Sequence, residues 1–197
     1  MNETIFRILA AVILFTGVGI SIYFRSKADR TSGEKLSRNV DGTPLMLVIR
    51  IFGLVLWLSP LVYLVNPVWM NWSKISLPEW SRWFGVVLGI FCVFGIYWLF
   101  TGIGSGITPV SATRKEHKLA TSGIYRWIRH PLYTVGSSFI VSFGLIADNW
   151  FIIALGMLAF TIMAIRTPKE EENLIEKFGD EYRDYMQRTG KFFPKFK

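Results

Sequence analysis

Apolar stretches alternate with shorter polar segments along most of the 197-residue chain. A helix rises about 1.5 Å per residue, so about 20 apolar residues are enough to cross a hydrocarbon core of about 30 Å. The pattern therefore predicts an all-α integral membrane protein with five transmembrane helices, forming a single membrane domain over residues 1–197. The predicted transmembrane helices are residues 5–24, 45–65, 83–103, 131–147 and 149–165.

The last two predicted helices have few residues to share. The sequence Ala-Asp-Asn at 147–149 is a turn signal, and it leaves roughly 15 to 17 residues for each helix, at or below the usual minimum of about 17. The pattern predicts a short antiparallel hairpin that begins and ends on the same side of the membrane. His130 is predicted to cap its first helix, with Pro131 in the first turn.

The polar tail, residues 166–197, carries its own apolar pattern. Its larger apolar residues recur at helical spacing, which predicts an amphipathic helix packed on the loops or lying along the membrane surface. They are Leu174, Ile175, Phe178, Tyr182, Tyr185 and Met186.

The charge of the chain bears on its orientation. A net charge of +8 would suggest a nucleic-acid partner in a soluble protein, but this chain is 51% hydrophobic and its basic residues lie mainly between the apolar stretches. Five of the 22 Lys and Arg residues follow the first predicted span, five follow the third and eight lie in the tail, whereas the Trp-rich segment 66–82 has two. The positive-inside rule predicts an outside N-terminus, a cytoplasmic C-terminus, contact with membrane lipids and no nucleic acid.

Residues that can support chemistry lie in the loop before the hairpin and in the tail after it. Both histidines, His117 and His130, are in that loop, and the tail begins with Arg166 followed by Glu170 and Glu171. Because the hairpin begins and ends on one side, the loop and the tail are predicted to converge at the membrane surface. Two histidines thirteen residues apart, without a cysteine partner, do not match a zinc ligand pattern, so no metal site is predicted.

Each of these residues also has a purely structural interpretation. His130 before a proline can serve only as a helix cap, and Arg166 can simply extend its charge to the lipid headgroups. Glu170 and Glu171 can stabilise the N-terminal turn of a helix through its dipole. The combination of motifs is what favours function.

The motifs GIYRWIRHPLY and EEENLIEKFGDEYRDYM, followed by Pro194, occur in one order over about the last 80 residues. In order and spacing they resemble the isoprenylcysteine carboxyl methyltransferase family, whose members are membrane enzymes that use S-adenosylmethionine. The resemblance implies an S-adenosylmethionine-dependent methyltransferase. It also implies a lipophilic acceptor that enters from the bilayer, with the C-terminal carboxylate of an isoprenylcysteine-like substrate as the methylated group.

The resemblance further implies roles for individual residues. Arg166 matches the family arginine assigned to the substrate, and Glu170 matches the glutamate assigned to the cofactor, with Glu171 beside it. Carboxylates suit ribose hydroxyls or the methionyl ammonium, while an imidazole or a helix N-terminus suits the methionyl carboxylate. The implied cofactor-binding residues are His117, Leu119, Ala120, Tyr125, His130, Pro131, Leu132, Tyr133, Glu170 and Glu171.

One departure from the family pattern affects the acceptor. Many relatives carry a Gly-x-x-Trp-Ser element before the first histidine, and the corresponding stretch here, GIGSGITPVSATRKEH, has no Trp-Ser. A phospholipid-amine methyltransferase, a small-thiol methyltransferase and a nicotinamide-dependent membrane reductase therefore remain alternatives. A membrane scaffold without enzymatic activity is the fourth.

Overall fold

The computed structural model describes residues 3–32, 44–103 and 119–195, and these residues are predominantly helical. They form no named strand, only two isolated bridges between single residues. The predicted all-α class is therefore confirmed. The helices are α1 (Glu3–Ser32), α2 (Pro44–Val65), α3 (Glu79–Ile103), α4 (Pro131–Ile146), α5 (Trp150–Phe178) and α6 (Asp180–Arg188), with short 3-10 helices η1 (Pro67–Ser73) and η3 (Gly123–Arg126).

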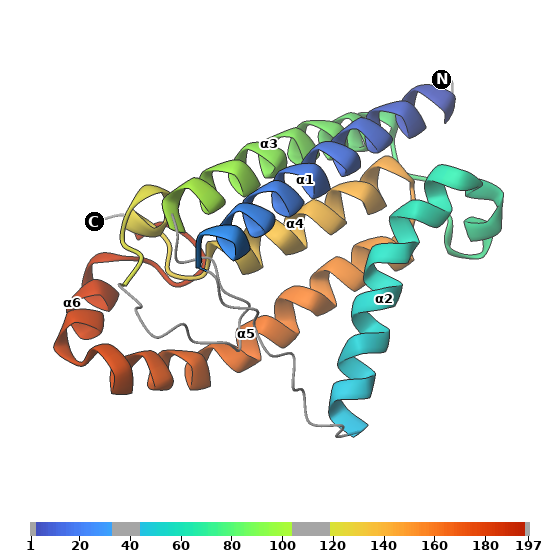
Figure 1. Cartoon of the computed structure of the whole chain (residues 1–197). Coiled ribbons are helices and arrows are strands. Elements are labelled where there is room, and N and C mark those ends of the chain that lie inside the picture. Colours follow the sequence, from blue (N-terminus) through green and yellow to red (C-terminus); the bar gives the residue numbers. More distant parts are fainter. Residues whose placement is uncertain (1–2, 33–43, 104–118, 196–197) are drawn as a thin grey trace.

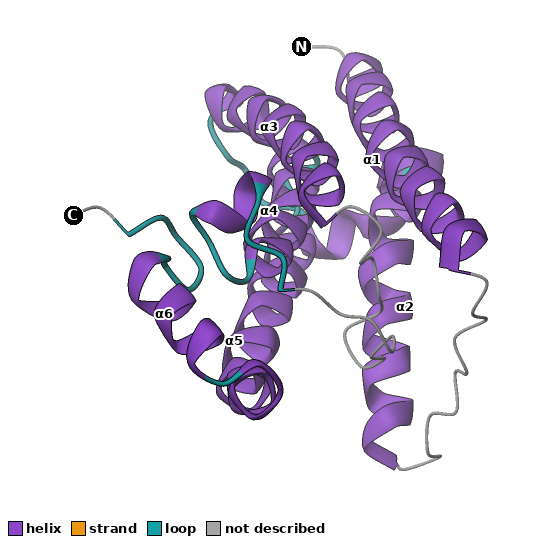
Figure 2. Ribbon diagram, turned by 60° about the vertical axis from the view of Figure 1, so that its left-hand side comes forward, coloured by secondary structure: helices purple, strands orange, loops and turns teal. Residues whose placement is uncertain are grey.

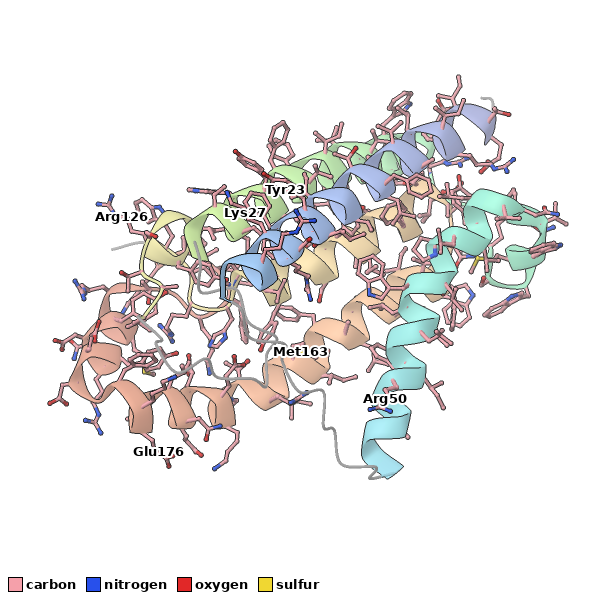
Figure 3. The ribbon with its side chains drawn as sticks, in the orientation of Figure 1. Tyr23, Lys27, Arg50, Arg126, Met163 and Glu176 are labelled. Atoms are coloured by element: carbon pink, nitrogen blue, oxygen red, sulfur yellow. The ribbon has the colours of Figure 1, made fainter. Side chains whose placement is uncertain are left out.

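The long helices form a bundle in which α4 is central. In Figure 1, α1, α3 and α4 lie side by side, and α5 runs along the other flank of α4. Helix α2 joins this bundle at its C-terminal end, and its N-terminal half leans away from α5 in both ribbon views (Figures 1 and 2). Arg50 lies on that leaning half (Figure 3).

Among the described residues, three helices are long and apolar enough to cross a membrane, so the chain is an integral membrane protein. The candidate spans are Glu3–Ala28, Glu79–Gly102 and Trp150–Phe178, and two shorter apolar helices cover Arg50–Val65 and Pro131–Ile146. These five segments correspond to the five predicted ones. Large apolar side chains such as Val12, Leu54 and Phe94 are exposed on the bundle, as lipid-facing residues are.

A cluster of polar side chains ties the bundle together at the end where α1 begins. Arg82 of α3 binds Glu3 of α1 at 3.0 Å and donates to the carbonyl of Ile146, at the end of α4, at 2.7 Å. Tyr63, near the end of α2, also donates to Glu3. Four helices therefore have one of their ends at this level.

At the opposite end, α1 and α3 meet the loop that precedes α4. Ala28 of α1 and Phe100 of α3 share a buried apolar cluster with Ile124 of η3. Helices α1 and α3 therefore run in the same direction, and the loop containing η3 lies where both of them end.

The helix that contains the last predicted span extends well beyond that span. α5 continues past Ile165 without interruption to Phe178, with Pro168 inside it, so the first part of the predicted tail belongs to the same helix. The chain breaks only at Gly179, whose φ of 58° suits a glycine, and α6 follows. The expected amphipathic helix is thus divided between α5 and α6.

Glycines allow α4 and α5 to approach closely. A Cβ at Gly156 of α5 would lie 2.7 Å from Val141 Cγ2 and 3.0 Å from the carbonyl oxygen of Ser137, both on α4, whereas a Cβ at Gly136 meets nothing within 4 Å. The predicted hairpin is therefore present, and it depends on small residues at its interface.

Replacing Gly156 with alanine should destabilise the hairpin by about 1–3 kcal/mol, the usual cost of overpacking. Gly136→Ala is the matched control, because it adds the same methyl group in open space and should leave stability unchanged or slightly higher. Thermal unfolding in detergent micelles measures both variants. Equal melting temperatures for the two would contradict close packing at Gly156.

Candidate functional site

Three segments meet at the end of the bundle where α3 finishes: the loop before α4, the distal part of α5 and the chain after α6. Figure 2 shows the loop and the C-terminal chain together beside α6. Backbone hydrogen bonds join them, from Arg129 to the carbonyl of Gly190 at 2.9 Å, from His130 to that of Lys191 at 3.0 Å and from Gly190 to that of Trp127 at 3.0 Å. The C-terminal chain therefore fixes the position of the loop.

A buried ion pair lies beneath this backbone ladder. Arg129 Nε is 2.9 Å from Glu171 Oε1, with side chains 9% and 8% exposed. Arg129 also donates to the carbonyls of Met186 and Thr189, at 3.0 and 2.5 Å. Lys191 approaches the other oxygen of Glu171 at 3.2 Å. Glu171 thus joins the loop, α5 and the C-terminal chain.

His130 lies between the two glutamates of α5. Its side chain is 5% exposed, with Nε2 3.2 Å from Glu171 Oε1 and Nδ1 4.0 Å from Glu170 Oε2. Burial lowers the pKa of this imidazole below its ordinary value, although both carboxylates act in the opposite direction. The imidazole is therefore neutral at pH 7. His130 is the N-cap of α4, as predicted, but its side chain makes no capping bond.

Glu170 has different surroundings from its neighbour. It accepts a hydrogen bond from the Tyr133 hydroxyl at 2.5 Å, and its side chain is 32% exposed. The rings of His130 and Tyr133 are stacked, with centroids 5.4 Å apart. Arg166 is exposed one turn earlier on α5 and lies within electrostatic range of Tyr133. Glu170 can therefore meet a ligand that Glu171 cannot reach.

The remaining predicted residues are more dispersed. Tyr125 is within electrostatic range of Glu170, and its carbonyl accepts a hydrogen bond from Tyr185. Pro131 is buried in the first turn of α4, beside the 37% exposed Leu132. Ala120 is half-buried, and His117 lies outside the described residues.

Leu119 lines a groove separate from the His130 cluster. This groove of about 730 Å³ lies between the loop and α6, and its lining includes Leu119, Arg126 and Tyr185 but neither His130 nor Glu170. Arg126 points away from the bundle there (Figure 3). The structure thus joins His130, Tyr133, Glu170 and Glu171 directly, while Leu119 lines the groove beside α6.

Sequence reasoning missed Lys191 as a contributor to the site. Lys191 carries no motif signal, because its role depends on how the chain returns after α6. Tyr182 of α6 was expected only as part of the amphipathic pattern, and its buried hydroxyl has no hydrogen-bond partner among the described residues.

The donor and acceptor groups fit a cofactor that carries a cationic nitrogen. Glu170 Oε2 and His130 Nδ1 are 4.0 Å apart, and no described side chain donates to Nδ1. If Nδ1 carries no hydrogen, these two neighbouring acceptors suit an ammonium group, such as the one that S-adenosylmethionine has in its methionyl part.

A sequence profile of the phospholipid methyltransferase family matches residues 80–181, more than half of the chain. The chain belongs to this family. The matched residues include most of α3, all of α4 and α5, and the loop with His130.

Named relatives of this family member confirm its resemblance to isoprenylcysteine methyltransferases. It is 32% identical over 134 residues to the protein-S-isoprenylcysteine O-methyltransferase of Dictyostelium discoideum, covering 64% of this chain and 55% of that protein. It is also 35% identical over 82 residues to the nickel-cobalt-cadmium resistance protein NccN of Alcaligenes xylosoxydans xylosoxydans, covering 42% and 38% respectively. The chain thus spans about half or less of these relatives' length.

A solved structure shares the fold. The eukaryotic intramembrane Ras methyltransferase, an isoprenylcysteine carboxyl methyltransferase, superposes with a TM-score of 0.55 at 20% sequence identity, covering 94% of this chain and 67% of that one.

Proposed function

We propose that this family member is an S-adenosylmethionine-dependent methyltransferase whose acceptor is the carboxylate of a lipophilic, isoprenylcysteine-like molecule. The observation that carries the proposal is the placement of a partly exposed Glu170 beside the neutral, buried His130, one turn from the exposed Arg166. The names of the Dictyostelium discoideum relative and of the solved structure support the same reaction.

The residues divide into a cofactor group and an acceptor group. S-adenosylmethionine supplies an already activated methyl group, so a carboxylate attacks it directly, without acid or base catalysis. Glu170, Tyr133 and His130 bind the polar part of the cofactor. Arg166 follows the apolar part of α5 and pairs with the acceptor carboxylate at the membrane surface. The contribution of the protein is alignment and exclusion of water.

We further propose that five helices cross the membrane, with the N-terminus outside and the C-terminus cytoplasmic. The contacts of Arg82 and Tyr63 support this, because they hold ends of α1, α2, α3 and α4 at one level. If α1, α3 and α5 cross in the same direction, α2 and α4 must cross back between them. The orientation rests on the basic residues of the loop and tail.

Isothermal titration of the purified protein with S-adenosylhomocysteine and with NADPH tests the proposal. Binding of S-adenosylhomocysteine alone, followed by methyl transfer to a farnesylated cysteine derivative, is the expected result. Binding of NADPH alone would favour the reductase, and binding of neither would favour a scaffold.

Glu170→Gln should weaken S-adenosylhomocysteine binding by more than about 1.4 kcal/mol, a tenfold change, because it removes a charge from a partly desolvated site. Glu172→Gln is the control, since Glu172 is exposed and, within the described part of the chain, pairs with Lys169 on the surface of α5. Titration calorimetry measures both. Unchanged affinity in a folded Glu170→Gln protein would remove Glu170 from the cofactor site.

Gly136→Trp should block a long-chain acceptor while cofactor binding stays nearly unchanged. Gly136 lies about one turn along α4 from Tyr133 and has open space where its Cβ would be, so it borders a route from the bilayer to the site. A prenyl chain stays in the membrane, because each CH₂ moved into water costs about 0.8 kcal/mol. Gly19→Trp on α1, another open position, is the control. Equal methylation of long and short acceptors by Gly136→Trp and the parent would exclude this route.

A further inference from the structure

We infer that Glu171 is a positioning residue rather than a cofactor ligand. It holds His130 in the tautomer with hydrogen on Nε2, so that Nδ1 and Glu170 together accept hydrogen bonds from an ammonium group. The positioning role of Glu171 follows from contacts within the protein. The identity of the ammonium group, which we assign to the methionyl part of the cofactor, rests on the proposed function.

The first step concerns the charge of Glu171. Its oxygens receive Arg129 at 2.9 Å and Lys191 at 3.2 Å, and the side chain is 8% exposed. Two cations around one buried carboxylate keep it ionised, and an ionised carboxylate can only accept hydrogen bonds. The contact of 3.2 Å between Glu171 Oε1 and His130 Nε2 therefore places the hydrogen on Nε2.

The second step concerns the other ring nitrogen. A neutral imidazole carries one hydrogen, so the hydrogen on Nε2 leaves Nδ1 as an acceptor. Nδ1 faces Glu170 Oε2 at 4.0 Å, and the Tyr133 hydroxyl already donates to that carboxylate. The pair thus presents one negative and one neutral acceptor to the same space, which suits a positively charged donor.

This arrangement reverses the polarity expected for His130. The sequence suggested an imidazole that binds the methionyl carboxylate, but the hydrogen needed for such a bond is committed to Glu171. Consecutive residues on a helix point about 100° apart, which explains how Glu170 can meet the ligand while Glu171 faces the C-terminal chain.

Protonation of His130 would remove the acceptor at Nδ1. The charged and titratable groups around the ring are Glu170 and Glu171 of α5, Arg129 of the loop, Lys191 of the C-terminal chain and Tyr133 of α4. Burial keeps the pKa of His130 below its ordinary value of about 6.5. Ammonium binding should therefore persist to a lower pH than an ordinary histidine would allow, and weaken as the imidazole gains its second proton.

Nitrogen NMR of the ligand-free protein, labelled with ¹⁵N-histidine, tests the tautomer directly. The chain has two histidines, so a His130→Gln sample identifies the His130 signals by their loss. A protonated Nε2 with an unprotonated Nδ1 at pH 7.5 is the expected result. A hydrogen on Nδ1, or on both nitrogens, would overturn the inference.

Glu171→Met should invert the tautomer, because Nε2 loses its acceptor and Nδ1 can then donate to Glu170. Glu172→Met is the matched control and should leave the His130 signals unchanged. Lys191→Met is a milder change whose backbone bond to the loop remains. It should keep the parental tautomer, because Arg129 still pairs with Glu171 and keeps it ionised. A folded Glu171→Met with the parental tautomer, or a Lys191→Met with the inverted one, would refute the role of Glu171.

The ammonium assignment has its own test. In Glu170→Gln, S-adenosylhomocysteine should lose more than about tenfold in affinity, while methylthioadenosine, which lacks the amino-acid part, should lose less than about twofold. Equal losses would assign Glu170 to the ribose and overturn the ammonium assignment. If the parent protein binds neither compound, the proposed function fails, while the tautomer measurement still decides the role of Glu171.

Discussion

Replacing Arg129 with methionine should lower the free energy of unfolding by about 3–5 kcal/mol, the usual cost of removing one partner from a buried ion pair. The side chains of Arg129 and Glu171 are 9% and 8% exposed, so water can compensate little for the loss. The variant also leaves the carbonyls of Met186 and Thr189 without their donor. The C-terminal chain should detach from the loop, and cofactor affinity should fall with it.

Thermal unfolding and limited proteolysis in detergent micelles measure the effect of Arg129→Met. Early cleavage after α6 is expected, because that chain is held to the loop by the contacts of Arg129 and by the adjoining backbone bonds. Arg126→Met in the same loop is the control, since the Arg126 side chain is exposed and points outward (Figure 3). Similar melting temperatures and cleavage patterns for the two variants would show that Arg129 does not anchor the C-terminal chain.

Hydrophobic patterning was sufficient for the positions of the helices, because the bilayer requires long apolar segments. It did not indicate how far α5 extends, since a run of charged residues after Ile165 is typical of a separate tail. The helix continues because Glu171 pairs with groups from the loop and the C-terminal chain. Thr167 also donates to the carbonyl of Met163 in the turn around Pro168. Tertiary contacts of this kind leave no periodic pattern in a sequence.

The sequence predicted which residues form the candidate site but not which of their side chains contact one another. A hairpin that begins and ends on one side brings His130 and the glutamates together, and this convergence followed from topology. Which glutamate faces the proposed ligand depends on the rotation of α5 about its axis. The sequence cannot distinguish them, because Glu170 and Glu171 are adjacent and identical. The role of Lys191 depends on the turn at Gly179 and on the packing of α6, which lies beyond sequence spacing.

Arg166→Lys should reduce turnover by about ten- to a hundredfold, while cofactor affinity stays close to that of the parent. The reduction corresponds to the loss of one charge-assisted hydrogen bond, which contributes about 1.5–3 kcal/mol. Arg166 is exposed on α5, and none of the described residues gives it a hydrogen bond or an ion pair. We propose that its guanidinium pairs with the acceptor. A planar fork pairs with both oxygens of a carboxylate, and lysine keeps the charge but not the fork.

Steady-state methyl transfer to a farnesylated cysteine derivative, together with titration of S-adenosylhomocysteine, separates the two effects in Arg166→Lys. Arg183→Lys is the matched control, because Arg183 is an exposed arginine of α6 that pairs with Asp180, one turn away. A parallel loss of turnover and cofactor affinity would place Arg166 in the cofactor site instead. Full activity in Arg166→Lys would mean that the acceptor presents a thiol or an amine, or that Arg166 only extends its charge to the lipid headgroups, because neither role requires the planar fork.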